Sequence, residues 1–182
     1  REGWPDNRKR VRRIYREEGL NLRSKRPRRS KAAAHRLSRM ESSSLDQCWS
    51  MDFVHDQLYN SSKIRALTIV DNFTRFCYAI VVKTTFKGIN VAEVMEDLRT
   101  KNKAVPKRIQ VDNGTEFTSK DFDRWAQTNN VTLDYSRPGK PTDNPFIESF
   151  NGSFRDECLN TKWFLSIEDA VEKIENWRIE YN

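Results

Sequence analysis

The fold is decided by residues 49–83, which read WSMDFVHDQLYNSSKIRALTIVDNFTRFCYAIVVK. Three stretches within it, residues 49–55, 64–71 and 76–83, are rich in β-branched and aromatic side chains. Turn-forming residues separate these stretches, and the pattern predicts three strands in succession. Consecutive strands joined by short turns form an antiparallel meander, so one half of a sheet is expected here.

Helical and strand patterns alternate after residue 83. Asn90 is placed to cap a helix, with Glu93 three residues later as its partner. The buried stripe of this helix is predicted at spacings of three and four residues, at Val91, Val94, Met95 and Leu98. A short strand is then predicted at residues 108–111, a helix at 119–129 and a strand at 131–135. The side chains expected to face inward from the second helix are Phe122, Trp125 and Ala126.

Two helices close the sequence. One is predicted at residues 145–159, beginning with Asn144-Pro145. The other is predicted at residues 167–181, with Ser166 and Asp169 as a capping pair. The order of elements, three strands followed by helix, strand, helix, strand and two helices, predicts an α/β fold with a mixed sheet flanked by helices.

Charge is distributed unevenly along the chain. Residues 1–40 contain 15 Lys or Arg and four acids, so they account for more than the whole net charge of +7. A block this basic either binds a polyanion or stays solvated, and nucleic acid is the favoured partner. A membrane surface is disfavoured, because the basic run at residues 23–31 lacks interleaved large apolar residues.

The length of 182 residues suits one domain with an appendage. Residues 7–19 are predicted to form a short helix with Val11, Ile14 and Tyr15 on one face, and residues 1–20 are interpreted as the C-terminal end of a helical DNA-binding region. Residues 21–47 are expected to be a basic linker with a short helix at 32–40, and residues 48–182 the folded core.

The three cysteines, Cys48, Cys77 and Cys158, lie far apart and form no C-x-x-C pair. This pattern argues against structural zinc and against a disulfide scaffold, and it favours a reducing, intracellular setting. No run of residues approaches the length of a membrane span, and the N-terminus is charged rather than signal-like. A cytoplasmic location is therefore expected.

Three carboxylates occupy positions that favour chemistry. Asp52 lies inside the first predicted strand among apolar neighbours, where an unpaired charge is costly. Asp112 ends the strand at residues 108–111, and Glu148 lies one turn into the helix that Asn144-Pro145 begins. Taken singly, each has an ordinary explanation: half of a salt bridge for Asp52, a turn former for Asp112 and a first-turn dipole partner for Glu148.

Taken together, the three acids form the ligand set of a metal-dependent phosphoryl-transfer site. Mg²⁺ takes oxygen ligands, and two ions about 4 Å apart can clamp the attacking and leaving oxygens of an in-line displacement. Three converging carboxylates without metal would repel one another and take up protons, whereas bound cations keep them ionised.

The spacing of these acids resembles that of a known group. Residues 113–147, which separate Asp112 from Glu148, number 35, as in the Asp-Asp-35-Glu group of retroviral integrases and bacterial insertion-sequence transposases. The neighbouring sequence is similar too, with WSMDF at 49–53, VDNGTEF at 111–117 and PGKPTDNPFIESFNG at 138–152. The last of these looks like the insertion-sequence branch, which also carries a basic residue seven positions after the glutamate, the place of Arg155 here.

The resemblance covers about residues 45–182 and implies a ribonuclease-H-like fold, with three antiparallel strands followed by two parallel ones. It implies a transposase, a polynucleotidyl transferase that cuts transposon ends and transfers the freed 3′-hydroxyl into another phosphodiester. Asp52 would bridge two Mg²⁺ or Mn²⁺ ions, while Asp112 and Glu148 would each complete one shell. The implied partners are transposon-end DNA, target DNA and further copies of the chain, in the nucleoid-associated cytoplasm of a bacterium.

Two departures from the family pattern are visible. The core is expected to be trimmed at both ends, because relatives in this family usually continue beyond it. The zinc-binding amino-terminal domain of retroviral integrases is not found in the sequence, so its role in forming multimers is not carried over.

DNA contacts are expected from three places. Arg155 and Asn151 would share a helix face with Glu148. Arg137 and Lys140 belong to the loop at residues 136–144, which is predicted to follow the phosphate backbone. The basic run is expected to neutralise phosphates with little sequence preference, through Arg23, Lys25, Arg26, Arg28 and Arg29.

Several other polar residues have more than one interpretation. His55 and Asp56 either support the metal site or simply expose polar groups at the end of a strand, and the second is favoured. Glu116 either orients the site or touches DNA, or it is a solvated loop acid. Asp71 is first a hairpin turn residue and second a candidate ligand. Trp125 and Trp177 fit helix cores better than base-stacking platforms.

Two other functions remain open. A nuclease of the same fold would cut nucleic acid without joining it, and the basic linker and the sequence around Glu148 favour the transposase over it. A DNA-binding regulator with an inert core is the other alternative, and the complete set of three acids argues against it.

Overall fold

A computed structural model describes residues 7–18, 42–136 and 144–182. The chain divides into two units, residues 1–39 and 40–182, and each is considered by itself. In the first unit α1 (Arg8–Glu17) is a helix on which Val11, Ile14 and Tyr15 are exposed. The helix predicted at residues 32–40 lies outside the described residues, as do residues 137–143 of the loop predicted at 136–144. None of the described helices is both long and apolar enough to cross a membrane.

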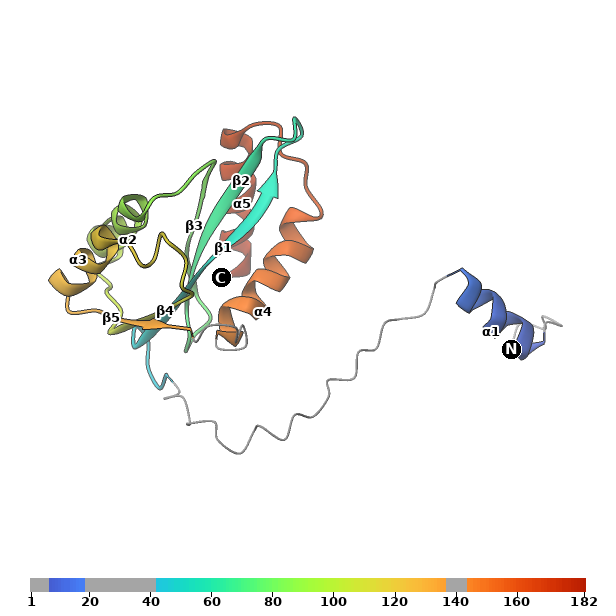
Figure 1. The fold of residues 1–182 in the computed structure, drawn as a ribbon, viewed down its shortest axis with the longest axis horizontal. Coiled ribbons are helices and arrows are strands. Elements are labelled where there is room, and N and C mark those ends of the chain that lie inside the picture. Colours follow the sequence, from blue (N-terminus) through green and yellow to red (C-terminus); the bar gives the residue numbers. More distant parts are fainter. Residues whose placement is uncertain (1–6, 19–41, 137–143) are drawn as a thin grey trace. The chain divides into compact units, whose positions relative to one another are not determined.

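The second unit is built on a five-stranded sheet (Figure 1). Its strands are β1 (Cys48–Gln57), β2 (Lys63–Asp71), β3 (Cys77–Lys83), β4 (Arg108–Val111) and β5 (Thr132–Tyr135). They lie in the order β3-β2-β1-β4-β5, with β2 antiparallel to both β3 and β1, β4 parallel to β1 and β5 parallel to β4. The predicted meander and the mixed α/β sheet are therefore confirmed.

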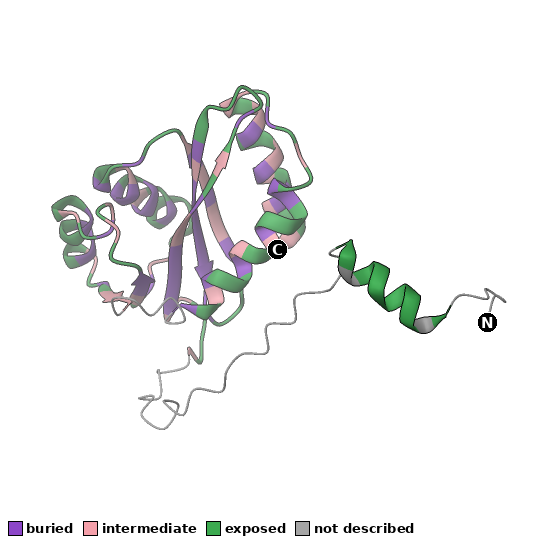
Figure 2. Cartoon of the chain, turned by 45° about the vertical axis from the view of Figure 1, so that its right-hand side comes forward, coloured by how far each residue is buried: buried purple, intermediate pink, exposed green. Residues whose placement is uncertain are grey.

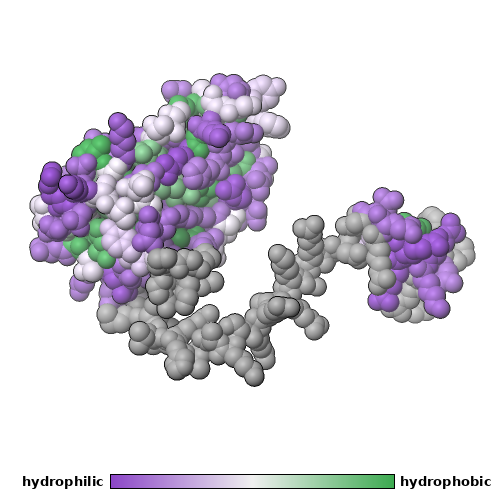
Figure 3. All heavy atoms as spheres, viewed as in Figure 1, coloured by the Kyte–Doolittle hydropathy of each residue, from purple (hydrophilic) through white to green (hydrophobic). Residues whose placement is uncertain are grey.

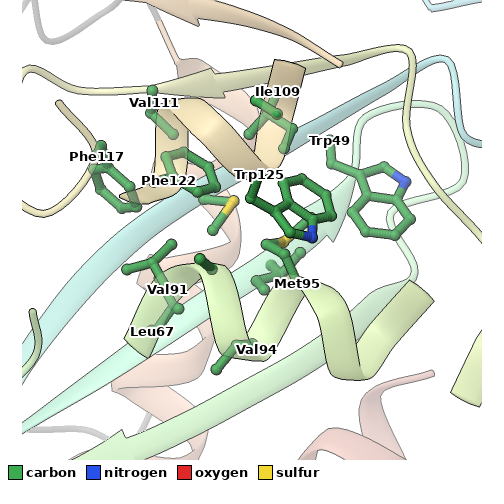
Figure 4. Close-up of a cluster of buried hydrophobic side chains, with 14 of the residues drawn as sticks. Trp49, Leu67, Val91, Val94, Met95, Ile109, Val111, Phe117, Phe122 and Trp125 are labelled. Carbon is green, nitrogen blue, oxygen red and sulfur yellow. The ribbon is translucent and has the colours of Figure 1, made fainter. Parts of the chain in front are cut away.

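One face of the sheet is covered by α2 (Gly88–Asn102) and α3 (Lys120–Thr128). The four predicted stripe residues of α2 are buried, as are Phe122, Trp125 and Ala126 of α3. They pack with Trp49, Met51 and Leu67 from the strands in one apolar cluster, part of which is shown in Figure 4. Removing apolar area from water in this way is the main source of stability for this half of the core.

The other face is covered by α4 (Pro145–Phe154), a π-helix η3 (Arg155–Leu159) and α5 (Ile167–Tyr181). A second cluster lies beneath them and includes Val54 and Ile64 from the strands and Phe150, Phe154 and Trp177 from the helices. Figure 2 shows the buried residues of these helices on the side that faces the strands. Trp125 and Trp177 both belong to the core, as predicted.

Two local predictions need correction. Asn90 is not the N-cap residue of α2: the N-cap is Lys87 and the helix begins at Gly88. The Asn90 side chain lies in the first turn, where its Oδ1 atom accepts a hydrogen bond from the Lys87 backbone N–H at 3.0 Å. The predicted helix at 145–159 is α-helical only to Phe154, because the chain then widens into the π-helix, where Cys158 and Leu159 are buried. π-Helical turns are rare and often occur at functional sites.

The predicted cap of α5 is present. The Ser166 Oγ atom accepts a hydrogen bond from the Asp169 backbone N–H at 3.2 Å. Asp169 does not return the bond to Ser166 but accepts the N–H of Leu165 at 2.9 Å, one residue earlier. The first turn of α5 is thus closed from both sides.

Candidate catalytic site

Asp52 lies in the middle of β1 on the face that α4 covers. Side chains alternate between the two faces of a strand, and Met51 belongs to the cluster under α2 and α3 while Val54 belongs to the cluster under α4 and α5. Asp52 therefore points to the same side as Val54. It is partly buried, and its Oδ1 atom accepts a hydrogen bond from the Phe53 backbone N–H at 2.7 Å.

The strand register brings Asp112 alongside Asp52. In the parallel pair of β1 and β4, Ser50 lies opposite Gln110. Asp52 comes two residues after Ser50 and Asp112 two residues after Gln110, so the two acids follow this last pair on neighbouring strands. Asp112 is exposed just beyond the end of β4, and its Oδ1 atom accepts the backbone N–H of Gly114 at 2.9 Å.

Glu148 reaches the same area from α4. Its backbone N–H bonds to the Asn144 carbonyl at 3.2 Å, and its side chain is exposed. Asn151 lies three residues later and therefore on the same helix face. The Asn151 Nδ2 group donates to the Asp52 Oδ2 atom at 2.8 Å, so the Glu148 face of α4 is the one that meets β1.

Asn151 also joins α4 to β2. Its Oδ1 atom accepts a hydrogen bond from the Thr68 hydroxyl at 3.0 Å, and Thr68 lies directly opposite Asp52 in the antiparallel pair. The sequence predicted a DNA contact for Asn151. That contact stays a prediction, and the structure adds that the amide holds the Asp52 carboxylate in one orientation.

Burial and the neighbouring charges act on Asp52 in the same direction. Burial, and to a lesser degree the negative charges of Asp112 and Glu148, raise the pKa of Asp52 to about 6. The hydrogen bonds from the Phe53 N–H and Asn151 oppose this rise without cancelling it. The three predicted carboxylates are thus near enough to interact electrostatically, and their mutual repulsion calls for a cation.

The three carboxylates are suitable ligands for a hard divalent cation, but their side chains are not yet close enough together to hold one. Within residues 7–18, 42–136 and 144–182, no three His, Cys, Asp or Glu side chains stand close enough together to hold an ion as they are. All three carboxylates provide only oxygen atoms, the ligands that Mg²⁺ prefers. Asp112 and Glu148 are surface side chains, so rotation toward Asp52 would cost little packing.

A buried polar network beside these acids was missed at the level of sequence. The Ser50 hydroxyl donates to the Asn144 Oδ1 atom at 2.7 Å, and the Asn72 Nδ2 group donates to the Gln110 Oε1 atom at 2.9 Å. All four of these residues are buried. The network anchors the start of α4 to β1 and β4, and this fixes where Glu148 projects. Buried polar groups need such partners, and Ser50 and Gln110 inside strands were the available signal.

Arg155 lies farther along the same side. Its guanidinium Nη2 group donates to the His55 backbone carbonyl at 3.4 Å, and the side chain is exposed. This places a cation beyond Asp52 in the direction in which β1 runs. The other predicted DNA-binding residues, Arg23, Lys25, Arg26, Arg28, Arg29, Arg137 and Lys140, lie outside the described residues.

The structure also shows the surroundings of His55, Asp71 and Glu116, for which the sequence left more than one interpretation open. The His55 side chain is exposed at the end of β1, which agrees with the favoured interpretation. Asp71 is fully buried and accepts the backbone N–H groups of Phe73 and Thr74 at 2.9 and 2.7 Å, as a turn residue does. Glu116 is not a solvated loop acid, because it is paired with Arg65 and its side chain is 14% exposed.

The sheet order and the placement of helices on both faces define a ribonuclease-H-like fold, the fold of integrase catalytic cores. The chain belongs to the integrase core domain family. One description of this family matches residues 43–141, and a second one matches residues 129–182.

Two relatives come from bacterial insertion elements. An uncharacterized 31.7 kDa protein of the insertion element IS407 from Burkholderia multivorans is 43% identical over 182 residues, all of this chain and 65% of that protein. An uncharacterized 39.2 kDa protein of IS476 from Xanthomonas euvesicatoria is 41% identical over 97% of this chain and 50% of that protein. The chain thus spans less than two thirds of either relative.

The fold is also shared with a retroviral core. The HTLV-2 integrase catalytic core domain, determined in complex with magnesium in a trimeric form, superposes with a TM-score of 0.53 at 18% identity. The match covers 71% of this chain and 82% of that one. At this identity the likeness supports the fold alone.

Proposed function

We propose that the chain is the catalytic domain of a bacterial insertion-sequence transposase, which cuts transposon-end DNA and transfers the freed 3′-hydroxyl into another phosphodiester. One observation carries the proposal. The pairing of β1 with β4 and the bond from Asn151 to Asp52 support a common site for Asp52, Asp112 and Glu148 on the side of the sheet that α4 covers. Family membership and the insertion-element relatives support the same function.

Asp52, Asp112 and Glu148 would hold two Mg²⁺ or Mn²⁺ ions. The bound ions would supply positive charge to the phosphoryl group as it is transferred. Asn151 holds one oxygen of Asp52 in place through a hydrogen bond. The hydrogen bond from Ser50 to Asn144 attaches the start of α4 to β1. Arg155 provides a cation for a DNA phosphate beside the carboxylates.

Two further partners belong to the proposal. DNA would also contact the basic residues of α1, among them Lys9, Arg10, Arg12 and Arg13. Copies of the chain would assemble on the two transposon ends, as the trimeric form of the HTLV-2 core suggests by analogy. On the face shown in Figure 3, hydrophobic residues lie in small separate areas.

An oligonucleotide assay with Mn²⁺ or Mg²⁺ tests the proposal. The substrate is a labelled transposon end of the parent element, and the products of cutting and joining are separated on a gel. We expect Asp52→Asn, Asp112→Asn and Glu148→Gln each to lower both activities by at least about 100-fold, since each removes a metal ligand. DNA binding measured in chelator should change by less than about twofold, because phosphate contacts come from cations.

Glu168→Gln serves as the matched control, because it removes an exposed acid in the first turn of α5. It should leave both activities unchanged. Full strand transfer by Glu148→Gln would show that the assignment is wrong. A chain that cuts the oligonucleotide but never joins it would be a nuclease of the same fold.

A further inference from the structure

An ion pair at the loop that carries Asp112, on the face of the sheet that α2 and α3 cover, has no part in the mechanism above. Arg65 on β2 donates through its Nη1 group to the Glu116 Oε1 atom in the loop after β4. The two side chains are only 22% and 14% exposed. Burial is the largest single influence and raises the pKa of Glu116, but the hydrogen bond and charge of Arg65 act together with the Thr115 hydroxyl and a backbone N–H to bring the pKa below its usual value. The pair therefore consists of two ions held largely away from water.

Aromatic packing holds the same pair in place. The Arg65 guanidinium carbon lies 4.1 Å from the centre of the Phe53 ring. Phe53 in turn stacks on Phe117 with ring centres 5.1 Å apart, and Phe117 is fully buried. Phe117 follows Glu116 directly, so two adjacent residues of the loop are attached to the sheet. Glu116 is bound to β2 through the ion pair with Arg65, and Phe117 packs on Phe53 of β1.

This loop, which follows β4, also contains Asp112. Between Asp112 and Phe117 the chain folds into a tight turn, in which the Phe117 and Thr118 N–H groups both bond to the Gly114 carbonyl at 3.0 Å. The carboxylates of Asp112 and Glu116 flank Gly114. A methyl group at Gly114 would lie 2.9 Å from the Asp112 Oδ1 atom and 3.4 Å from the Glu116 Oε2 atom. Glu116 is thus a second carboxylate within a few ångströms of a proposed metal ligand.

Stability alone does not account for this arrangement. A largely buried ion pair is often no better for stability than apolar residues of the same volume, because both charges lose their hydration. The Arg65 Nε atom is buried and has no hydrogen-bond partner in the described part of the chain. What the ion pair provides, and an apolar pair would not, is a defined direction for the Glu116 carboxylate.

We propose that Arg65 is a positioning residue that fixes the Asp112 loop and holds Glu116 away from the cation that Asp112 binds. The inference rests on the proposed function, because it assigns Arg65 a role at that metal site. Without Arg65, Glu116 is a carboxylate with no cationic partner beside Asp112, and it keeps the hydrogen bond from the Thr115 hydroxyl at 3.1 Å. It then competes for the cation and draws the loop out of place.

The experiment compares the variants Arg65→Gln, Glu116→Gln and Arg65→Gln/Glu116→Gln with the wild-type chain. Arg178→Gln is the matched control: Arg178 is 17% exposed, pairs with Glu175 and lies on α5 instead of beside the Asp112 loop. Three quantities are measured: Mn²⁺ binding by calorimetry without DNA, hydrogen exchange of residues 112–118, and the Mn²⁺ concentration for half-maximal cleavage.

We expect Arg65→Gln to weaken Mn²⁺ binding and raise the half-maximal Mn²⁺ concentration by about 10- to 100-fold. Exchange of residues 112–118 should quicken by about tenfold, since the loop loses one of its two attachments. The double variant should recover to within about threefold of the wild type in both Mn²⁺ measurements, because the competing carboxylate is gone. Arg178→Gln should lower the melting temperature and leave all three quantities unchanged.

The inference is wrong if Arg65→Gln changes Mn²⁺ binding and loop exchange no more than Arg178→Gln does. It is equally wrong if the double variant binds Mn²⁺ as weakly as Arg65→Gln, because Glu116 would then not be a competitor. Failure of the proposed function looks different: the wild-type chain would bind Mn²⁺ and still cleave no DNA. Calorimetry and exchange do not depend on cleavage, so the two failures are separable.

Discussion

Asp52 is held in a setting that disfavours its own charge. It is partly buried in a central strand, two other carboxylates act on it, and one amide and one backbone N–H are the hydrogen-bond donors to it. Most buried acids are paired with a cation, and this one is paired with Asn151. The burial of Asp52 therefore lowers the free energy of unfolding of the metal-free chain and keeps a carboxylate at the proposed metal site.

Asp52→Asn should therefore stabilise the metal-free chain at neutral pH. The folded-state pKa of Asp52, about 6, lies above its ordinary value of 3.8, so folding favours the protonated form. This contribution is present below pH 4 and is lost as the pH rises through 6. We expect the free energy of unfolding of the variant, relative to the wild type, to increase by about 2 kcal/mol between pH 4 and pH 7 in EDTA.

Urea unfolding at several pH values measures that difference. A constant difference between the two proteins across this range would contradict the raised pKa. The variant should at the same time be inactive, so stability and activity would move in opposite directions.

Close contacts between elements decide where the Asp112 loop lies. α2 begins at Gly88 and packs there against the start of α3, and a Cβ atom at Gly88 would lie 1.8 Å from the Ser119 Oγ atom and 2.2 Å from its Cβ atom. Ser119 caps α3 by accepting the Phe122 N–H. The Glu116 carbonyl is 3.1 Å from the same Cβ position, so the loop shares this contact.

Gly88→Ala should lower the free energy of unfolding by about 2 to 3 kcal/mol, because a methyl group there has no space. Gly152→Ala in α4 is the matched control, since a Cβ atom at Gly152 meets nothing within 4 Å. That substitution should stabilise the chain by about 0.5 to 1 kcal/mol through helix propensity. Equal effects of the two substitutions in thermal unfolding would contradict the packing of α2 against α3.

The whole second unit joins two apolar layers through one sheet, and the proposed metal site lies where strands and α4 meet. Asp52 and Asp112 come from neighbouring strands, and Glu148 comes from the helix layer. A cation bound by all three would connect the sheet to α4 and would bind the folded chain only. Metal binding should thus be visible in the stability of the entire unit.

Mg²⁺ should raise the melting temperature of the wild-type chain. At a concentration ten times the dissociation constant the gain is about 1.4 kcal/mol, or about 3 to 5 °C for a unit of this size. Asp52→Asn and Glu148→Gln should lose this shift, and Glu168→Gln should keep it. An equal shift in all four proteins would mean that Mg²⁺ binds elsewhere.

The amino-acid sequence by itself determined the strands, most of the helices and the three acids. These follow from local causes: side-chain alternation places Asp52 in a strand, the pair Asn113-Gly114 ends a strand at Asp112, and Pro145 starts the helix that carries Glu148. Local rules misplaced the start of α2 and missed the π-helix, because tertiary packing moved those boundaries.

Only the tertiary structure decided which groups the acids meet. Three of these contacts join residues far apart along the chain. The partners are 99 residues apart for Asn151 and Asp52, 94 for Ser50 and Asn144, and 51 for Arg65 and Glu116. A hydrogen bond or ion pair depends on position to within a fraction of an ångström. Such positions result from how whole helices and strands pack, and no local pattern in the sequence encodes them.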